Sequence, residues 1–179
     1  PALVYDNYDA RAAKLPVILD LVSQGIDSGL KMLVFSQFTS FLAEIGHQLD
    51  EAGIAHYKLT GQTPAKKRLE MVDAFNADDT PVFLISMKAG GTGLNLTGAS
   101  LVILADPWWN AAVQEQASDR AHRIGQTRDV NVVKVVAKDT IEERIVALQE
   151  TKRKLAASLV GNQSEAMLAT LTADDLIDL

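Results

Sequence analysis

The sequence of 179 residues contains no cysteine, which excludes disulfide bonds and metal sites built from thiolates. It contains only three histidines, and the spacing of His47, His56 and His122 does not match a pair of metal ligands. No run of about 18 apolar residues is present, so neither a membrane-spanning helix nor a membrane partner is expected. The N-terminus also lacks the charged start and apolar stretch of a signal peptide. These absences predict an intracellular protein without a bound metal.

The net charge of -6 argues against nucleic-acid binding over the whole surface. Residues 162–179, however, contain four acidic residues and no basic one. Without them, 17 basic residues face 19 acidic residues, so the remaining chain has a net charge of only -2. Any nucleic-acid surface is therefore expected to be a local patch. We predict one domain over residues 1–161 and an acidic C-terminal tail over residues 162–179, and Pro1 indicates a segment of a longer protein.

Apolar runs typical of buried strands alternate with segments that have the periodicity of helices. Strands are expected at 31–35, 56–59, 82–86, 101–105 and 130–137. Helices are expected at 15–28, 39–53, from 63 past 75, from 110, and from 140 to about 158. Continuous apolar strands separated by helices predict an α/β fold, with a parallel sheet and helices on both faces.

Several helix ends and faces can also be predicted. Thr39 is expected to cap the second helix, and Gly53 to end it. The third helix is expected to turn Leu69, Val72 and Phe75 inward. Thr140 and Glu143 have the spacing of a capping box at the start of the last helix.

Polar, glycine-rich and aromatic residues follow the predicted strands. The segments concerned are 36–39, 60–63, 87–93 and 106–110. Because the carboxyl ends of parallel strands lie at one edge of a sheet, these segments are expected to meet there. The sequence thus predicts a ligand-binding edge.

The segment from Lys88 to Gly93 combines a cation with small residues. Its backbone N–H groups could approach a phosphate, although a tight turn would require the same glycines. No Gly-Lys-Ser/Thr follows, so it is not a P-loop, and Leu96 replaces the third glycine of a dinucleotide fingerprint.

Gln116, Arg120 and Arg123 lie at i, i+4 and i+7 of a predicted helix, on one stripe. Two guanidinium groups on one stripe repel each other unless an anion lies between them, and a triphosphate would suit them. The alternative is a solvated face on which Asp119 pairs with Arg123.

Two other features also allow more than one interpretation. The adjacent Trp108 and Trp109 could stack on a base, or pack at the sheet edge or against another domain. The basic residues 66–68 form either a solvated face or, with Gly61 and Thr63, a phosphate site at a helix N-terminus.

Taken together, these segments resemble the C-terminal RecA-like lobe of the Swi/Snf family of ATPases in helicase superfamily 2. Residues 31–38 resemble helicase motif IV, and residues 61–75 resemble the motif that follows it. Residues 86–96 resemble motif V, and residues 106–126 resemble motif VI with its lead-in. The resemblance extends from about residue 15 to about residue 155, in the family's order.

The resemblance implies a role for individual residues. Arg120 and Arg123 would be arginine fingers, typically worth about 10³–10⁵ in rate, and Gln116 would orient them. Gly93 and Asn95 would lie near the nucleotide. The residues that would line the DNA backbone track are Ser36, Gln37, Gly61, Thr63, Ser86, Lys88 and Gly90.

The resemblance also implies the partners. Trp108 and Trp109 would couple this lobe to an N-terminal RecA-like lobe of the same polypeptide. That lobe would hold most of the contacts to ATP and Mg²⁺, because this sequence has neither a Walker loop nor a strand-end acidic box. The second partner would be double-stranded DNA.

The function implied is the second motor lobe of an ATP-dependent DNA translocase, in a parent protein that is a DNA-dependent ATPase. This segment alone is expected to be inactive. One alternative is a non-catalytic module that binds DNA or a partner with the same fold. Another is an isolated nucleotide-binding enzyme, which the lack of a complete phosphate loop disfavours. The short acidic tail resembles bacterial family members, which predicts a location in the cytoplasm or nucleoid; a eukaryotic source would predict the nucleus.

Overall fold

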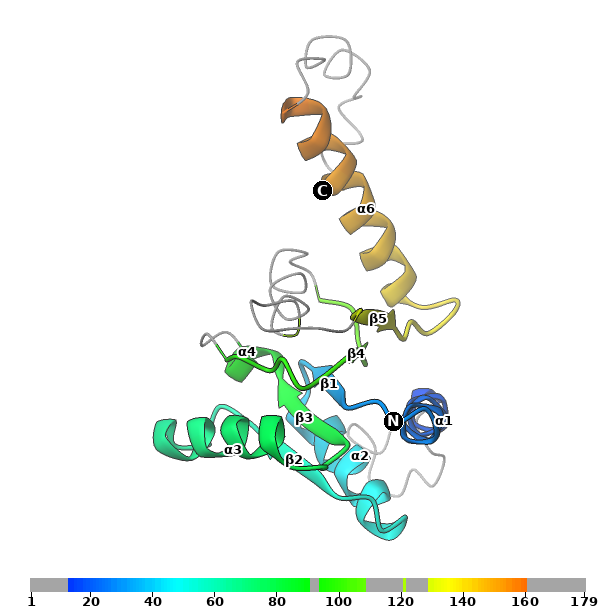
Figure 1. Cartoon of the computed structure of the whole chain (residues 1–179). Helices are drawn as coiled ribbons and strands as arrows, with labels where there is room; N and C mark the ends of the chain where they lie inside the picture. Colours follow the sequence, from blue (N-terminus) through cyan, green and yellow to red (C-terminus); the bar gives the residue numbers. More distant parts are fainter. Residues whose placement is uncertain (1–12, 91–93, 109–120, 122–128, 161–179) are drawn as a thin grey trace. The chain divides into compact units, whose positions relative to one another are not determined.

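The computed structural model describes residues 13–90, 94–108, 121 and 129–160 (Figure 1). The chain divides into two compact units, residues 1–137 and residues 138–179. The helices and strands of the first unit, in chain order, are α1 (Lys14–Asp27), β1 (Met32–Ser36), α2 (Thr39–Glu51), β2 (His56–Leu59), α3 (Ala65–Ala77), β3 (Val82–Ser86), α4 (Met87–Gly90), β4 (Leu101–Leu104) and β5 (Asn131–Lys134).

In the described part of the chain, the strands form one five-stranded parallel sheet in the order β2-β3-β1-β4-β5. Met32 pairs with Val82 on one side and with Leu101 on the other, so three strands begin level with one another. The carboxyl ends of the strands therefore lie along one edge. The expected α/β fold with a parallel sheet is confirmed.

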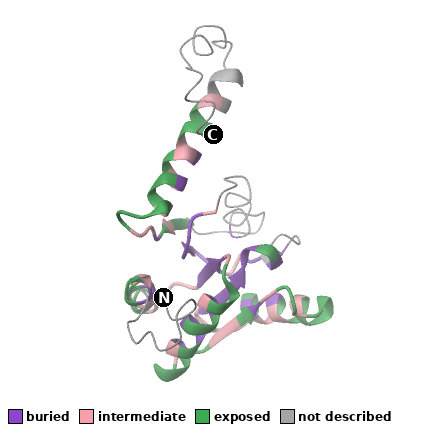
Figure 2. Cartoon of the chain, turned by 180° about the vertical axis from the view of Figure 1, so that it is seen from behind, coloured by how far each residue is buried: buried purple, intermediate pink, exposed green. Residues whose placement is uncertain are grey.

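The central strands are buried (Figure 2). Their side chains alternate between two cores. Leu33 and Phe35 belong to the core that contains Val72 and Phe75 of α3. Val34, which lies between them, and Met32 belong to the core that α1 and α2 complete on the opposite face. Helices thus cover both faces, as predicted. Each buried Phe contributes about 2–3 kcal/mol through the apolar surface that it removes from water.

Glycines end α1 and α2 in the same way. Gly53 has φ +68°, and its N–H donates to Asp50 O at 3.0 Å while the N–H of Ile54 donates to Leu49 O at 2.8 Å. Gly29 has φ +65° and sits in an equivalent pair of hydrogen bonds after α1. This is a Schellman motif, which favours glycine because the left-handed conformation is strained for residues with a Cβ atom. The predicted end of the second helix at Gly53 is confirmed.

Two expectations about helices were wrong. Leu69 is 63% exposed, because it lies about 1.7 helical turns from Phe75 and so points away from the core. The N-cap of α2 is Phe38, without a side-chain cap, and Thr39 is the first helical residue. The turn before α2 is held instead by Ser36, whose Oγ accepts the N–H of Phe38 at 3.0 Å.

Two further segments differ from the expected structure. The last strand is limited to Asn131–Lys134, shorter than 130–137, and most of its residues are exposed. The start of the predicted glycine-rich loop, Met87–Gly90, is helical.

The second unit contains α6 (Ile141–Val160). Thr140 Oγ1 accepts the N–H of Glu142 at 3.2 Å, and Glu143 Oε2 accepts the N–H of Asp139 at 2.8 Å. These are the two elements of the predicted capping box, each displaced by one residue. The boundary expected between residues 161 and 162 stays a prediction, because residues 161–179 lie outside the described chain.

Candidate functional site

A cleft of about 230 Å³ lies where three neighbouring strands end. β2, β3 and β1 are adjacent in the sheet, so the segments that follow them meet at this edge. The cleft is lined by Gln37, Thr39, Thr60, Gly61, Gln62, Ser86 and Lys88. The lining offers two amides, three hydroxyl groups and one ammonium group, and none of these described lining residues is acidic. This set of donors suits an anion with several oxygen atoms.

The wall contributed by the loop after β2 is held from behind by Arg68. Arg68 Nε donates to Thr63 O at 2.7 Å, and its Nη2 donates to Gly61 O at 3.0 Å. Thr63 Oγ1 also accepts the N–H of Thr60 at 3.1 Å, which closes the turn. One guanidinium group and one hydroxyl group therefore set the conformation of this wall.

The wall contributed by the end of β1 is attached to the end of β4 through Asp106. Asp106 is 5% exposed, and Oδ2 accepts the hydroxyl of Ser36 at 2.5 Å while Oδ1 accepts the N–H of Gln37 at 3.0 Å. The side-chain amide of Gln37 donates to Pro107 O at 3.4 Å. Two strand ends are thereby joined side by side.

The third wall comes from the end of β3 and from α4. Ser86 pairs in register with Ser36 of β1, and its hydroxyl accepts the N–H of Ala89 at 3.4 Å. Lys88 is exposed on α4 and lines the cleft. Its ammonium group is the only cation among the described lining residues.

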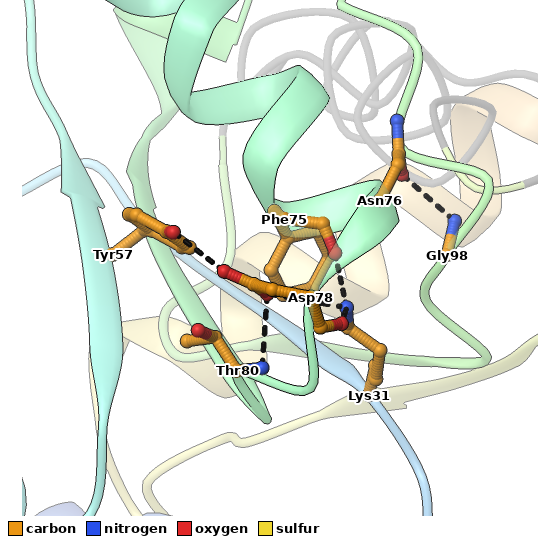
Figure 3. Close-up of polar contacts among 7 residues, drawn as sticks. All are labelled: Lys31, Tyr57, Phe75, Asn76, Asp78, Thr80 and Gly98. Carbon is orange, nitrogen blue, oxygen red and sulfur yellow. Dashed lines mark hydrogen bonds and ion pairs between the residues drawn. The ribbon is translucent and has the colours of Figure 1, made fainter.

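The segment 94–98 is fastened to the end of α3 by Asn76. Asn76 Nδ2 donates to Asn95 O at 2.8 Å. Asn76 Oδ1 accepts the N–H of Gly98 at 3.0 Å (Figure 3). A Cβ on Gly98 would lie 3.1 Å from that Oδ1, so glycine allows the close approach. The side chain of Asn95 remains exposed.

A second polar cluster lies at the amino edge of the sheet (Figure 3). Asp78 accepts the hydroxyl of Tyr57 at 2.6 Å and the N–H of Thr80 at 3.0 Å. Lys31 Nζ donates to the carbonyl oxygens of Phe75 and Asp78, and it lies 3.7 Å from Asp78 Oδ1 and 4.3 Å from the centre of the Phe75 ring. The ammonium group thus supplies donors to the carboxyl end of α3.

Ionisation in this cluster reflects both burial and pairing. The hydrogen bond from Tyr57, with the bonds from Thr80 and the charge of Lys31, holds the pKa of Asp78 below its ordinary value. The same hydrogen bond raises the pKa of Tyr57. Burial lowers the pKa of Lys31 by more than the charges of Asp78 and Asp79 raise it.

The structure brings together four of the residues predicted for the DNA track, Gln37, Gly61, Ser86 and Lys88. Ser36 is fully buried behind the cleft, and Thr63 supports its wall from outside the lining. Gly90 is the last residue of α4.

The residues predicted for the nucleotide and for the first lobe are only partly within the described chain. Trp108 is partly buried and packs against the core on the α3 side, as the packing alternative predicts. Asn95 lies beside α3, away from the cleft lining. The predicted residues that lie outside the described chain are Gly93, Trp109, Gln116, Arg120 and Arg123.

The DNA track implied by the family resemblance omits three lining residues, Thr39, Thr60 and Gln62, and two supporting residues, Asp106 and Arg68. The three lining residues all lie in segments 36–39 and 60–63, which the sequence predicted at the ligand-binding edge. Asp106 also carried a signal, because a carboxylate directly after a buried strand needs partners. Arg68 was grouped with Gly61 and Thr63 in one interpretation of residues 66–68, but nothing in the sequence showed that it binds their carbonyl oxygens.

Within the described residues, no helix is long and apolar enough to cross a membrane. The same residues contain no group of three or more histidine, aspartate or glutamate side chains that could hold a metal ion.

Comparison with known proteins identifies the family of this fold and site. The family described as "Helicase conserved C-terminal domain" matches residues 13–125. The DNA repair protein rad5 of Aspergillus fumigatus is 41% identical over 83% of the chain, and the ATP-dependent helicase rhp16 of Schizosaccharomyces pombe is 45% identical over 84% of it. A crystal structure of the C-terminal part of the Fun30 ATPase domain is similar over 80% of the chain, with a TM-score of 0.75 and 36% identity.

The chain spans 14% and 17% of the length of these two relatives, and 47% of the solved chain. What those proteins do as a whole depends on parts that this chain does not include.

Proposed function

Because the chain belongs to the helicase conserved C-terminal domain family, as a RecA-like lobe of the Swi/Snf type, we propose that it is the second motor lobe of an ATP-dependent translocase on double-stranded DNA. The parent protein would be a DNA-dependent ATPase, and its first lobe would contain the phosphate-binding loop that this sequence lacks. The observation that carries the proposal is the cleft at the carboxyl ends of β2, β3 and β1.

The cleft suits the backbone of DNA better than its bases. Phosphate oxygens accept hydrogen bonds from amides, hydroxyl groups and ammonium groups without regard to sequence, and these are the groups of the lining. The N-terminus of α2 adds support, because Thr39 lines the cleft and the first N–H groups of a helix have no partner within it. With one cation in the lining, few counterions are released, so binding is expected to be weak but dependent on salt.

For the nucleotide side, we propose that Arg120 and Arg123 reach the triphosphate held by the first lobe, with Gln116 orienting them. Guanidinium groups stabilise charge that builds on a transferring phosphoryl group. Gly93 and Asn95 would lie near the nucleotide, and the exposed carboxamide of Asn95 is a suitable donor. ATP and Mg²⁺ would be held mainly by the first lobe.

We also propose that Trp108 and Trp109 contact the first lobe. Trp108 directly follows Pro107 at the sheet edge and is only partly buried.

The proposal can be tested with the two-lobe parent protein and its Lys88→Ala variant. Affinity is measured for two unrelated duplexes at two salt concentrations. We expect similar affinities for both duplexes, a loss of affinity in the variant, and a shallower dependence on salt because one phosphate contact is gone. Lys67→Ala is the matched control, since it removes the same charge from an exposed position outside the lining.

Strong discrimination between the two duplexes would indicate base readout and contradict the proposal. DNA binding without any DNA-stimulated ATP hydrolysis would support the non-catalytic binding module instead.

A further inference from the structure

We propose that Asp106 is a positioning residue that couples occupation of the cleft to ATP turnover. The inference rests on the proposed function. It assigns the coupling to one buried carboxylate that joins the end of β1 to the end of β4.

The carboxylate controls the conformation of the cleft wall through both of its oxygen atoms. The hydroxyl of Ser36 has one hydrogen atom, and its 2.5 Å contact to Asp106 is much shorter than its 3.3 Å contact to Phe38 O. The hydrogen is therefore donated to Asp106, while the Ser36 oxygen accepts the N–H of Phe38 at 3.0 Å. The N–H of Gln37 donates to the second carboxylate oxygen at 3.0 Å. Ser36 and Gln37 thus bind Asp106 directly, and Phe38 is held through Ser36.

Burial makes this geometry costly to change. Ser36 is 0% exposed and Asp106 is 5% exposed, so water cannot easily replace a lost partner. Without the carboxylate, the buried hydroxyl of Ser36 would keep only the 3.3 Å contact to Phe38 O, and the N–H of the half-buried Gln37 would lose its acceptor. The end of β1 would then adopt other conformations.

The contacts around Asp106 include Pro107, from which the sequence leads to the predicted arginines. Gln37 lines the cleft, and its side chain donates to Pro107 O, the residue after Asp106. The chain runs from there through Trp108 to residues 116–123, where the predicted fingers lie in the sequence. A ligand that displaces Gln37 therefore affects two adjacent residues after β4, Asp106 through the backbone N–H of Gln37 and Pro107 through its side chain. Ser36, which was predicted to contact DNA, instead binds Asp106 behind the cleft wall.

The described chain offers a matched control at the opposite edge of the sheet. Asp78, like Asp106, accepts a hydroxyl, that of Tyr57, and a backbone N–H, that of Thr80, and it also lies 3.7 Å from the ammonium group of Lys31. A purely structural role predicts a loss of stability for both carboxylates, with turnover lowered only in proportion to that loss. A coupling role predicts a consequence for turnover at Asp106 alone.

The experiment uses the two-lobe parent protein and the variants Asp106→Ala, Asp106→Asn and Asp78→Ala. Three quantities are measured for each: ATP turnover without DNA, turnover at saturating duplex DNA, and duplex affinity. Thermal unfolding reports whether each variant is folded. The asparagine variant is informative because its Oδ1 can still accept the N–H of Gln37 and its Nδ2 can donate to the oxygen of Ser36.

We expect Asp106→Ala to lower turnover at saturating DNA by about tenfold. Its affinity for the duplex should also fall, because residues 36–38 are no longer held in the shape that lines the cleft, so turnover is compared at saturating DNA. Asp106→Asn should recover most of the stimulated rate, because it restores two hydrogen bonds without the charge. Asp78→Ala should keep its stimulation by DNA even if its unfolding temperature falls further than that of Asp106→Ala.

Three results would overturn the inference. In the first, Asp106→Ala keeps full stimulation. In the second, it loses affinity while its rate at saturating DNA is unchanged, so that Asp106 shapes the cleft only. In the third, both alanine variants lose all activities in proportion to their loss of stability. A wild-type protein without DNA-stimulated turnover would contradict the proposed function itself, and that result is separate from these three.

Discussion

Arg68 donates from Nε to the carbonyl oxygen of Thr63 at 2.7 Å, and so holds the loop after β2 in the shape that lines the cleft. Arg68→Ala should therefore lower both stability, by about 1–2 kcal/mol, and the affinity for duplex DNA. Lys67→Ala removes the same charge from the same helix without touching the loop and should have little effect on either. Denaturant unfolding and DNA titration of both variants test this. Equal losses of DNA affinity in the two variants would show that affinity depends on the positive charge and not on the geometry of the loop.

The isolated chain is expected not to hydrolyse ATP, because it contains neither a phosphate-binding loop nor a strand-end acidic box for Mg²⁺. Phosphate release is measured with and without duplex DNA, after repeated purification. Turnover that persists and that Arg123→Ala abolishes would contradict the assignment of this chain as half of an ATPase site.

Arg123→Ala in the two-lobe protein should lower DNA-stimulated turnover by about two or more orders of magnitude and leave DNA affinity almost intact. Lys88→Ala should instead raise the DNA concentration needed for stimulation and leave turnover without DNA little changed. The two variants are compared by turnover and DNA affinity, after confirming that each is folded. If Arg123→Ala loses affinity and keeps its turnover at saturating DNA, its helix stripe faces DNA. No change in either variant would favour the solvated-face interpretation.

Stability should depend on the ionisation of Asp78. The pKa of this carboxyl is held below its ordinary value, first by the hydrogen bond from Tyr57. A group whose pKa is lower in the folded state stabilises the fold at pH values above its unfolded pKa, and this contribution is lost as the pH falls through the folded value. The stability difference between the wild type and Asp78→Asn should therefore be present at neutral pH and shrink below about pH 4.

Unfolding of both proteins by denaturant between neutral and acidic pH measures that difference. Tyr57→Phe, which removes the hydrogen-bond donor, should reproduce part of the effect. A difference that is constant across the pH range would show that Asp78 acts without its charge.

The sequence predicted the sheet well because burial leaves a clear pattern. The five strands occur where apolar runs were found. Gly53 ends α2 in a left-handed backbone conformation, which glycine adopts without strain. The errors arose where local spacing was ambiguous. Leu69 was assigned to the apolar face of the third helix by spacing alone. The limits of β5, whose residues are mostly exposed, were less clear from the sequence than those of the central strands.

The location of the candidate site was predicted more completely than the contacts that hold its walls in place. The rule that strand ends share an edge placed Gln37, Gly61, Ser86 and Lys88 together. It could not show that Arg68 folds back on its own loop or that Asp106 reaches β1, because such contacts depend on side-chain direction after folding. Spacing likewise could not distinguish Ser36, which is buried, from Gln37, which faces the cleft.

The strand β1 connects the two polar clusters, and this restricts how its sequence can vary. Lys31 precedes it in the cluster around Asp78, and Ser36 ends it in the contacts with Asp106. Inserting one residue between them would exchange the side chains of the two cores, because successive residues of a strand face opposite ways. It would also remove either Lys31 or Ser36 from its partners. Exchange of one apolar residue for another leaves both ends in place, so in this strand the number of residues is constrained more tightly than their identity.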